Sequence, residues 1–249
     1  CALWERQGYR VTRLGVDNKG RLNLDEYRDA LDDDTAIVSI MWANNEVGNI
    51  YPIKKMAEMA RERGILFHTD AVQAAGKIPL DLADVPVDML SISGHKLHAP
   101  KGIGLLIVGL GVACQLAKDS MHDELTRVAA LRDRLEKGIV SQIPDTLVNG
   151  DTENRVPNTT NISFRNIEGE AILLMLNQYN ICASSGSACT SGSLEPSHVL
   201  HAMGVPFKYA HSSTRLSLSR YNTQEEVDFA ISKFPEIIAT LRKLSPFKD

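Results

Sequence analysis

Two places in the sequence put reactive side chains directly after patterns that predict buried strands. Asp70 follows the apolar run 65–68, and Lys96 follows the run 89–92. Ligands of open α/β sheets bind beyond the carboxyl ends of the strands, so we expect both side chains at one edge of a sheet. A lysine can hold the aldehyde of pyridoxal phosphate, and a carboxylate can keep the ring nitrogen of that cofactor charged. The pair therefore predicts chemistry on pyridoxal phosphate.

Each of these residues also has a plainer interpretation. Asp70 can cap the segment that follows it, and Lys96 can be a solvated loop lysine. His95 and His98 are spaced like a metal pair, but no carboxylate or thiolate lies near them in the sequence to complete a zinc site. Ser93 and His95 are instead placed to donate to a phosphate. The combination of Lys96 with Asp70, rather than either residue alone, favours the cofactor interpretation.

One cysteine stands in a stretch that offers it little apolar packing. Residues 183–193 read ASSGSACTSGS, which predicts a mobile loop with Cys189 as an exposed nucleophile. Cys114, in a helical pattern, and Cys182, in an apolar strand-like segment, are predicted to be packing residues. Arg215 opens a strand pattern, where a guanidinium can bind a carboxylate through two parallel hydrogen bonds or form a surface ion pair.

The composition is that of an ordinary globular protein. Of the 249 residues, 43% are hydrophobic, which is enough for one large domain or two smaller ones. A net charge of −4 without a basic block argues against a nucleic-acid partner. No apolar run reaches the roughly 18 residues that a membrane span needs. Four scattered cysteines indicate a reducing, cytoplasmic location. The sequence begins with Cys1 and not Met, so we expect a native start to be missing.

Strand and helix patterns alternate in the first part of the chain. A helix is predicted from Pro52 to Arg63, ended by Gly64, and strands are predicted at 36–42, 65–68, 89–92 and 103–108. This alternation predicts a mostly parallel α/β sheet with right-handed crossovers.

The second part of the chain has a mixed pattern. Strands are predicted at 161–164 and 214–219, and helices at 112–142, 168–179 and 223–244. The last helix carries Thr223 and Glu226 as a capping box. We therefore expect a large sheet domain over residues 1–108 and a smaller α+β domain over residues 109–249.

At these residues the sequence resembles the cysteine desulfurases. The stretches HTDAVQAAGK, SISGHKLHAPKGIG, SSGSACTSGSLEPSHVL and AHSSTRLSLSR match the motifs of that family in order and spacing, and WANNEVG and PNTTNISF also fit. The long Ser/Gly loop resembles the NifS/IscS class, leaning to the nitrogen-fixation type. The resemblance implies a fold-type I transferase of the class-V aminotransferase family that uses pyridoxal phosphate, forms a homodimer and supplies sulfur for iron–sulfur cluster assembly.

The resemblance also assigns roles to individual residues. The residues that would contact the cofactor are Asn45, Asp70, Gln73, Ser93, His95 and Lys96, the last of them covalently. Asn45 and Arg215 would contact the substrate, L-cysteine, and Cys189 would take its sulfur as a persulfide, leaving L-alanine. Cys189 would then pass sulfur to an iron–sulfur scaffold or another acceptor protein, and would transiently share iron or a cluster with that scaffold as a metal ligand.

Two parts of the family pattern are absent. One precedes residue 1 and carries a phosphate loop and a histidine that stacks on the cofactor ring. The other is a basic, glycine-rich stretch that belongs after Val108, where this sequence continues directly with Gly109. We expect missing residues there, with the Cα atoms of Val108 and Gly109 further apart than about 3.8 Å, and a cofactor pocket that is empty or incomplete.

Three alternatives stay open from the sequence. A selenocysteine lyase and another class-V enzyme, such as a small aminotransferase, would share the fold, although a transaminase needs no thiol at position 189. An inactive, truncated fragment that only binds a scaffold protein is the alternative from a different functional class, and the missing segments favour it.

Overall fold

The first part of the chain is built on a parallel sheet. The computed structural model describes residues 2–98, 114–185 and 197–246. The sheet has the strand order β1-β2-β3, formed by Ile37–Met41, Leu66–Asp70 and Met89–Ser91. Met41 pairs with Asp70, and Asp70 pairs with Ser91, so the carboxyl ends of the three strands are level. The strands predicted at 36–42, 65–68 and 89–92 are confirmed.

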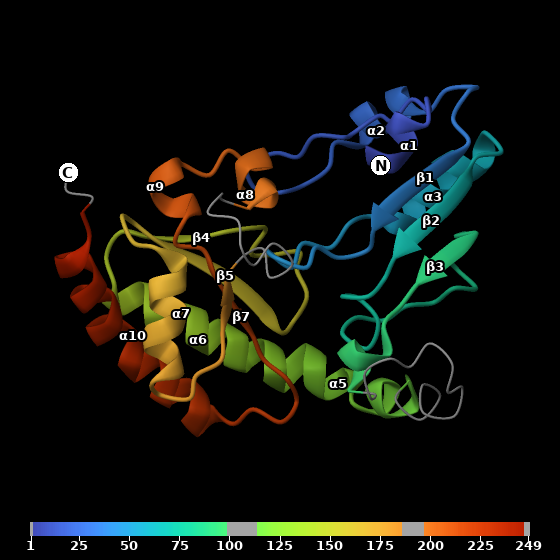
Figure 1. The fold of residues 1–249 in the computed structure, drawn as a ribbon. Coiled ribbons are helices and arrows are strands. Elements are labelled where there is room, and N and C mark those ends of the chain that lie inside the picture. The colour runs from blue at the N-terminus through green and yellow to red at the C-terminus, as the bar shows by residue number, and fades with distance from the viewer. Residues whose placement is uncertain (1, 99–113, 186–196, 247–249) are drawn as a thin grey trace.

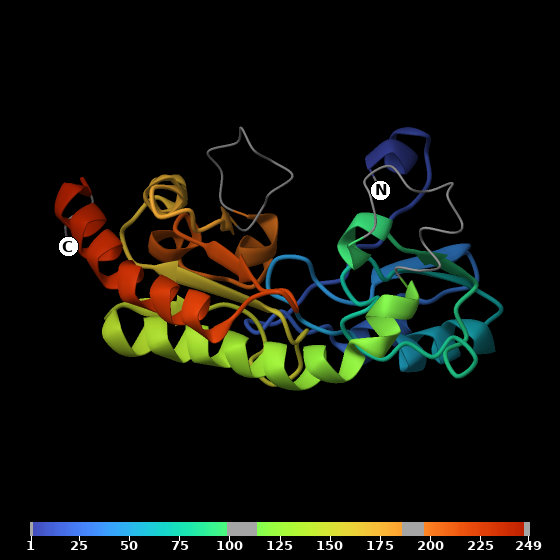
Figure 2. The same ribbon diagram turned by 90° about the horizontal axis from the view of Figure 1, so that it is seen from below.

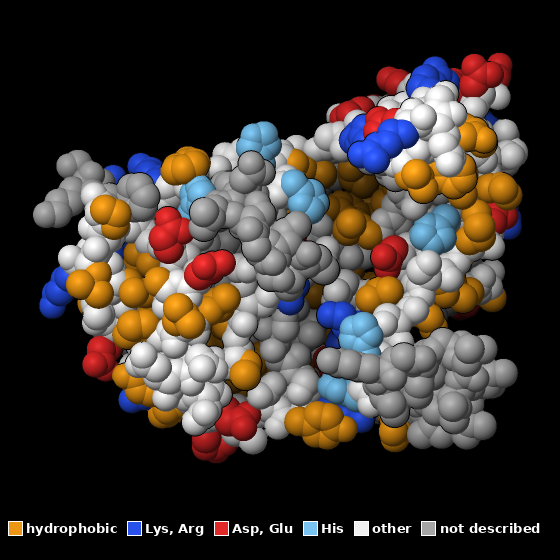
Figure 3. Space-filling model, in the orientation of Figure 1, with side chains coloured by type: hydrophobic (Ala, Val, Ile, Leu, Met, Phe, Trp, Pro, Cys, Tyr) orange, Lys and Arg blue, Asp and Glu red, His pale blue; other side chains and the backbone are white. Residues whose placement is uncertain are grey.

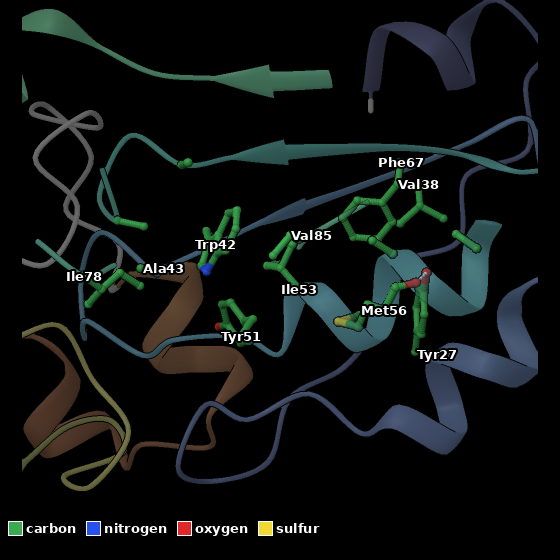
Figure 4. Packing of buried hydrophobic residues seen from close by; sticks show 14 of the residues in the cluster. Tyr27, Val38, Trp42, Ala43, Tyr51, Ile53, Met56, Phe67, Ile78 and Val85 are labelled. Carbon is green, nitrogen blue, oxygen red and sulfur yellow. Dashed lines mark hydrogen bonds between the residues drawn. The ribbon is translucent and has the colours of Figure 1, made fainter. Parts of the chain in front are cut away.

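Helix α3 (Ile53–Glu62) covers one face of this sheet. It ends before Gly64, whose φ of 69° lies in the left-handed region that stops a helix, as the sequence predicts. The buried residues of α3 lie on one side at helical spacing and are Ile53, Met56, Ala57 and Ala60. Figure 4 shows Ile53 and Met56 packed beneath Val38 and Phe67 of the sheet. Helix α2 (Leu24–Ala30) joins this core.

The opposite face of the parallel sheet is open among the described residues. Side chains alternate along a strand, and those on the open side are exposed or half-buried: Ile37, Ser39, Met41, Leu66, His68, Asp70, Met89 and Ser91. Figure 3 shows hydrophobic side chains at the surface over this part of the molecule. Asp70 therefore belongs to the open face, whereas its neighbour Thr69 points into the core.

The second part of the chain is an antiparallel sheet with helices packed around it. The strand order is β4-β5-β7-β6, formed by Thr146–Val148, Thr159–Phe164, Thr214–Ser217 and Ser184–Ser185. All six residues of β5 are buried. Three helices complete this layer, α6 (Ala129–Gln142), α7 (Gly169–Asn177) and α10 (Gln224–Leu244). Their apolar residues form one core with the sheet, including Phe164, Ile172 and Phe234.

Two long helices dominate this part of the molecule (Figure 2). Thr223 and Glu226 form the predicted capping box at the start of α10. Residues 114–119 are helical and Ser120 interrupts them. The chain then runs without a break through α5 (Met121–Asp123), the π-helical turn η2 (Glu124–Val128) and α6. The helix predicted at 112–142 is thus confirmed over its described length, apart from the turn at Ser120.

The shortest elements were not predicted from the sequence. They are β4, β6, α1 (Ala2–Arg6), α2, α8 (His198–Ala202), α9 (Phe207–Ala210) and the 3-10 helix η1 (Gly94–Leu97). Figure 1 places α8 and α9 beside the antiparallel sheet. No helix within residues 2–98, 114–185 and 197–246 is both long and apolar enough to cross a membrane.

Several predictions fall outside the described residues. They are the strand at 103–108, the break between Val108 and Gly109, the proposed domain boundary, and most of the loop 183–193 with Cys189.

One sequence-based prediction was wrong. Cys114 and Cys182, predicted to be packing residues, are both exposed. The neighbours of Cys182, Ile181 and Ala183, pack against the core of the second part, and this turns the Cys182 side chain outward.

Candidate active site

The carboxyl ends of β2 and β3 carry the first group of candidate residues. Asp70 ends β2 and stands beside Ser91, and the backbone N–H of Ala71 donates to the Ser91 carbonyl at 2.9 Å. The Asp70 side chain is exposed, and its Oδ1 accepts a hydrogen bond from the Val72 N–H at 2.9 Å. That local turn is a form of the capping role considered from the sequence. It uses one carboxylate oxygen, so it does not exclude a ligand at the other.

The segment after β3 carries the second group. Lys96 is half-buried in η1. Ser93 Oγ and His95 Nδ1 lie 2.7 Å apart, so the structure brings together the two residues proposed for a phosphate. His98 ends η1 with a φ of 62°, a left-handed conformation that turns the chain sharply. Among the described residues, no group of three or more His, Cys, Asp and Glu could hold a metal ion.

A small cavity of about 10 Å³ lies beside Lys96. Its ionisable lining among the described residues is Lys77, Lys96, His98, Glu124 and Arg220. Asp70 and half-buried Gln73 do not line it. The structure therefore places Lys96, Asp70 and Gln73 at the same edge of the sheet, but it does not arrange all three around this cavity.

Asn45 and Arg215 are in contact although they are 170 positions apart in the sequence. Arg215 Nη1 donates a hydrogen bond to the backbone carbonyl of Asn45 at 2.8 Å. Asn45 lies in the loop after β1, and Arg215 lies on β7, paired in register with Ser184 of β6. Both residues are half-buried. The two residues proposed for the substrate are thus neighbours, and the contact joins the two parts of the chain.

The residue after Asn45 is a buried carboxylate that the sequence reasoning missed. Ser197 Oγ donates a hydrogen bond to Glu46 Oε2, and Asn161 Nδ2 donates to the Glu46 backbone carbonyl at 3.2 Å. Burial raises the pKa of the Glu46 carboxyl, and the Ser197 hydrogen bond with the charges of His198 and Arg215 offsets only part of that effect. The available signal was an acidic residue inside an otherwise uncharged, Asn-rich stretch.

A second missed feature crosses the open face of the parallel sheet. His68 Nδ1 lies 2.9 Å from Ser39 Oγ, and His68 Nε2 lies 2.9 Å from Ser91 Oγ. Side chains therefore link β1, β2 and β3 just before the strands end. His68 and Asp70 are two positions apart on β2, so they share the open face. That period-2 spacing was visible in the sequence.

Cys189 lies outside the described residues. The segment 186–196 that contains it connects β6 to Ser197. Ser184, in β6, pairs with Arg215, and Ser197 donates to Glu46. The described residues on either side of this segment therefore contact Arg215 on one side and Glu46, the neighbour of Asn45, on the other.

Comparison with known proteins places this chain and its fold in a family. The model of the family described as "Aminotransferase class-V" matches residues 2–118 and 106–229. The match covers most of the chain, which therefore belongs to the class-V aminotransferase family. A solved structure entitled "NIFS-LIKE PROTEIN" superposes with a TM-score of 0.86 at 33% identity, over 96% of this chain and 71% of the other.

Within that family, cysteine desulfurases are among the similar proteins. The "Cysteine desulfurase" of Gluconacetobacter diazotrophicus is 54% identical over 100% of this chain and 70% of its own length. "Cysteine desulfurase NifS" of Azotobacter vinelandii is 51% identical over 99% of this chain and 69% of its own length. The chain therefore falls among the cysteine desulfurases of the class-V aminotransferase family.

The family implies pyridoxal phosphate as cofactor, and the donor set at the strand ends fits that group. Asp70 offers a carboxylate for a pyridinium nitrogen, and Lys96 offers an amine for an aldehyde. Ser93 and His95, already joined by a hydrogen bond, offer a hydroxyl and an imidazole for a phosphate. These groups come from two neighbouring strand ends that the sheet register holds level.

Proposed function

We propose that this chain is a pyridoxal-phosphate-dependent cysteine desulfurase that converts L-cysteine into L-alanine and keeps the sulfur as a persulfide on Cys189. The observation that carries the proposal is the 54% identity to a cysteine desulfurase over the whole chain. The position of Asp70 and Lys96 at adjacent strand ends supports it independently, because the pair is what the cofactor chemistry needs.

Six residues would bind the cofactor. Pyridoxal phosphate, when bound, supplies an electron sink for negative charge that develops on the substrate. Asp70 would hold the ring nitrogen in its charged form, and Gln73 and Asn45 would orient the ring. Ser93 and His95 would hold the phosphate. Lys96 would hold the aldehyde covalently until the substrate amine displaces it.

Lys96 and Arg215 would then act on the substrate itself. The Arg215 guanidinium would bind the α-carboxylate, and its hydrogen bond to the Asn45 carbonyl fixes one end of the planar fork in place. Lys96, once released, would remove the α-proton and later return a proton to carbon. Both residues are half-buried, which limits the competition from water.

Cys189 would perform the sulfur transfer. Its thiolate attacks the substrate sulfur, a sulfur–sulfur bond forms, and the carbon–sulfur bond breaks with its electron pair left on carbon. Protonation of that carbon completes L-alanine. A free thiol is only a few per cent ionised near neutral pH, so a base or a positive charge near the site has to favour the thiolate.

We also propose that a family segment is absent from this chain after Val108. The alignment to the Gluconacetobacter relative runs over 280 positions, which exceeds the 249 residues of this chain, so the relative has residues without a counterpart here. The two stretches matched by the family model overlap at residues 106–118. A division into domains 1–108 and 109–249 is proposed on the same ground. It is supported by two main hydrophobic cores, although Val156 belongs to the core of the first part and Val47 packs with Leu200 and Met203 of the second.

The partners and the setting are proposed from the family. We propose a homodimer and a protein acceptor for the persulfide sulfur, with an iron–sulfur scaffold as the main acceptor and Cys189 as the residue that meets it. A role in nitrogen fixation and a cytoplasmic location are proposed with them, because one of the similar proteins is a NifS.

The test is a turnover assay on the protein loaded with pyridoxal phosphate. With L-cysteine and dithiothreitol, the unaltered protein should release sulfide and L-alanine in equal amounts. Lys96→Ala should lose both products and the yellow absorbance, whereas Cys189→Ala should keep the absorbance and lose sulfide. Cys182→Ala, which removes an exposed thiol, is the matched control and should behave as the unaltered protein.

Two outcomes would overturn this function. If the unaltered protein takes up no cofactor, the chain is an inactive fragment. If Cys189→Ala releases sulfide at the full rate, the thiol step is wrong even though the cofactor chemistry stands.

A further inference from the structure

A buried carboxylate beside Lys96 has no role in the function proposed above. Glu124 is 2% exposed and is the first residue of the π-helical turn η2. Its Oε1 accepts a hydrogen bond from Lys77 Nζ at 2.8 Å, in an ion pair that is almost fully buried. Its Oε2 is also buried and has no hydrogen-bond partner. An unsatisfied carboxylate oxygen is costly, and π-turns occur often at functional sites, so this residue calls for an explanation.

Glu124 and Lys96 line the same cavity. Its volume of about 10 Å³ is close to the space that one water molecule needs. Lys77 reaches the cavity from the turn after β2, Lys96 and His98 from η1, and Arg220 from the segment after β7. The cavity is therefore polar enough to hold a water, and small enough to hold little else.

Positive charge dominates the lining of the cavity. Lys77, Lys96 and Arg220 are cationic side chains, whereas Glu124 is the one carboxylate among the described residues around it. The effect of these charges is visible at His98. Burial lowers the pKa of His98, Lys77 and Arg220 lower it further, and Glu124 acts in the opposite direction. Lys96 lines the same cavity, so Glu124 is the one carboxylate that shares this lining with it among the described residues.

We propose that Glu124 is a positioning residue for Lys96 that acts through one water molecule bound in this cavity. The water donates to Glu124 Oε2, which gives the buried oxygen its partner, and its own oxygen faces the Lys96 side of the cavity. The fixed negative charge of Glu124 favours the positively charged form of the Lys96 nitrogen, and Lys77 opposes it. This inference rests on the proposed function, because it requires Lys96 to hold the cofactor.

The experiment is a pH titration of the visible absorbance of the cofactor-loaded protein. In Glu124→Gln the midpoint should fall by roughly one pH unit, because a nearby negative charge no longer favours the protonated nitrogen. In Lys77→Gln the midpoint should rise, because a nearby positive charge is gone. Asp123→Asn is the matched control, since Asp123 precedes Glu124 on the same helix but pairs at the surface with Arg127. Its midpoint should equal that of the unaltered protein.

The opposite shifts of the midpoint expected for Glu124→Gln and Lys77→Gln distinguish an electrostatic effect from a structural one. A purely structural disturbance would shift both variants the same way, and that result, or unchanged midpoints, would overturn the proposal. Thermal unfolding of the cofactor-free variants shows whether they fold. If Glu124→Gln does not fold, Lys77→Gln decides alone, and a midpoint that does not rise overturns the proposal. If the unaltered protein shows no absorbance band, the proposed function fails together with this inference. An absorbance band whose midpoint does not shift in the variants overturns this inference but leaves the proposed function in place.

Discussion

The two parts of the chain treat their polar groups differently. In the antiparallel sheet, β5 is buried at all six positions. The buried carboxylate of Glu136 accepts hydrogen bonds from Arg155 and from Thr160 of β5. Among the described residues, one face of the parallel sheet is open, and Asp70 and His68 lie on it. The difference indicates that the antiparallel sheet uses its polar groups within the fold, while the parallel sheet keeps the polar groups of one face available for chemistry.

Two buried glutamates show the comparison in the direction of their pKa shifts. Burial by itself would raise the pKa of Glu136, but hydrogen bonds from Arg155 at 2.6 Å and 3.0 Å and from Thr160 overcome it and hold that pKa below its usual value. At Glu46 burial prevails, and the pKa is raised. Glu136 therefore behaves as a structural ion pair, whereas Glu46 is a charge left incompletely compensated beside the candidate substrate residues.

The largest effect is expected in the core of the second part. Phe164 is fully buried and stacks on Phe234 with ring centroids 5.8 Å apart. Phe164→Ala should lower the free energy of unfolding by about 3–5 kcal/mol, because it leaves a cavity. Leu66→Ala is the matched change on the open face, where Leu66 is 51% exposed, and should cost no more than about 0.5 kcal/mol. Urea denaturation measures both, and equal losses would contradict the contrast between the buried core and the open face.

The next effect concerns Glu136. Glu136→Gln should lower the free energy of unfolding near pH 7 by about 1–3 kcal/mol, because it leaves the buried Arg155 guanidinium with only the more distant carboxylate of Asp133, 3.7 Å away. Asp228→Asn, which breaks an exposed pair with Arg134, is the control and should leave the free energy of unfolding nearly unchanged. A loss at Glu136 no larger than at Asp228 would show that the buried pair is not a stability element.

The destabilisation caused by Glu136→Gln should depend on pH in one direction. The folded pKa of Glu136 is lowered, so its stabilisation is present above the ordinary value of 4.5 and is lost as the pH falls through the folded pKa. The difference in stability between the unaltered protein and Glu136→Gln should therefore shrink on acidification. Denaturation curves collected between neutral and acidic pH test this, and a difference that grows as the pH falls would reverse the assignment.

The smallest stability effect is expected at Glu46. Glu46→Gln keeps an acceptor for Ser197 and removes a poorly compensated charge, so the free energy of unfolding at pH 7 should stay the same or rise, within about 1 kcal/mol. The raised folded pKa means that the carboxyl stabilises the fold fully below pH 4.5 and loses this contribution as the pH rises through the folded pKa. The advantage of the Gln variant should therefore grow with pH. If Glu46→Gln lowered the free energy of unfolding as much as Glu136→Gln does, the proposed difference between the two glutamates would be wrong.

Much of the fold was predictable, because its main elements have strong sequence periodicity. Helix α3 has an apolar stripe and a glycine stop, and α10 has a capping box, so local signals and tertiary structure agree. The strands β4 and β6 have only three and two residues, too few for a pattern to emerge, and their pairing comes from the neighbouring strands.

The positions of Asp70 and Lys96 after the ends of β2 and β3 were predictable, because the strand patterns before them are clear, while their roles in the site stay predictions. The Arg215–Asn45 contact was not predictable from spacing, because it joins residues 170 positions apart. Glu46 and Glu124 were missed for a related reason. A sequence does not show that a charge is buried, and the partner of Glu124 is 47 positions away.

The most direct test of the account is mass spectrometry of the cysteine peptides after a single exposure of the cofactor-loaded protein to L-cysteine without a reductant. The account predicts one added sulfur atom on the peptide that contains Cys189, formed together with one L-alanine. No Lys or Arg lies between Cys182 and Cys189, so trypsin leaves both on one peptide, and fragment ions have to assign the added sulfur to one of them. Cys114 and Cys182 serve as internal controls and should stay unmodified, although both of these thiols are exposed. Sulfur spread evenly over the four cysteines, or found only on Cys1, Cys114 or Cys182, would contradict the assignment of Cys189 as the acceptor.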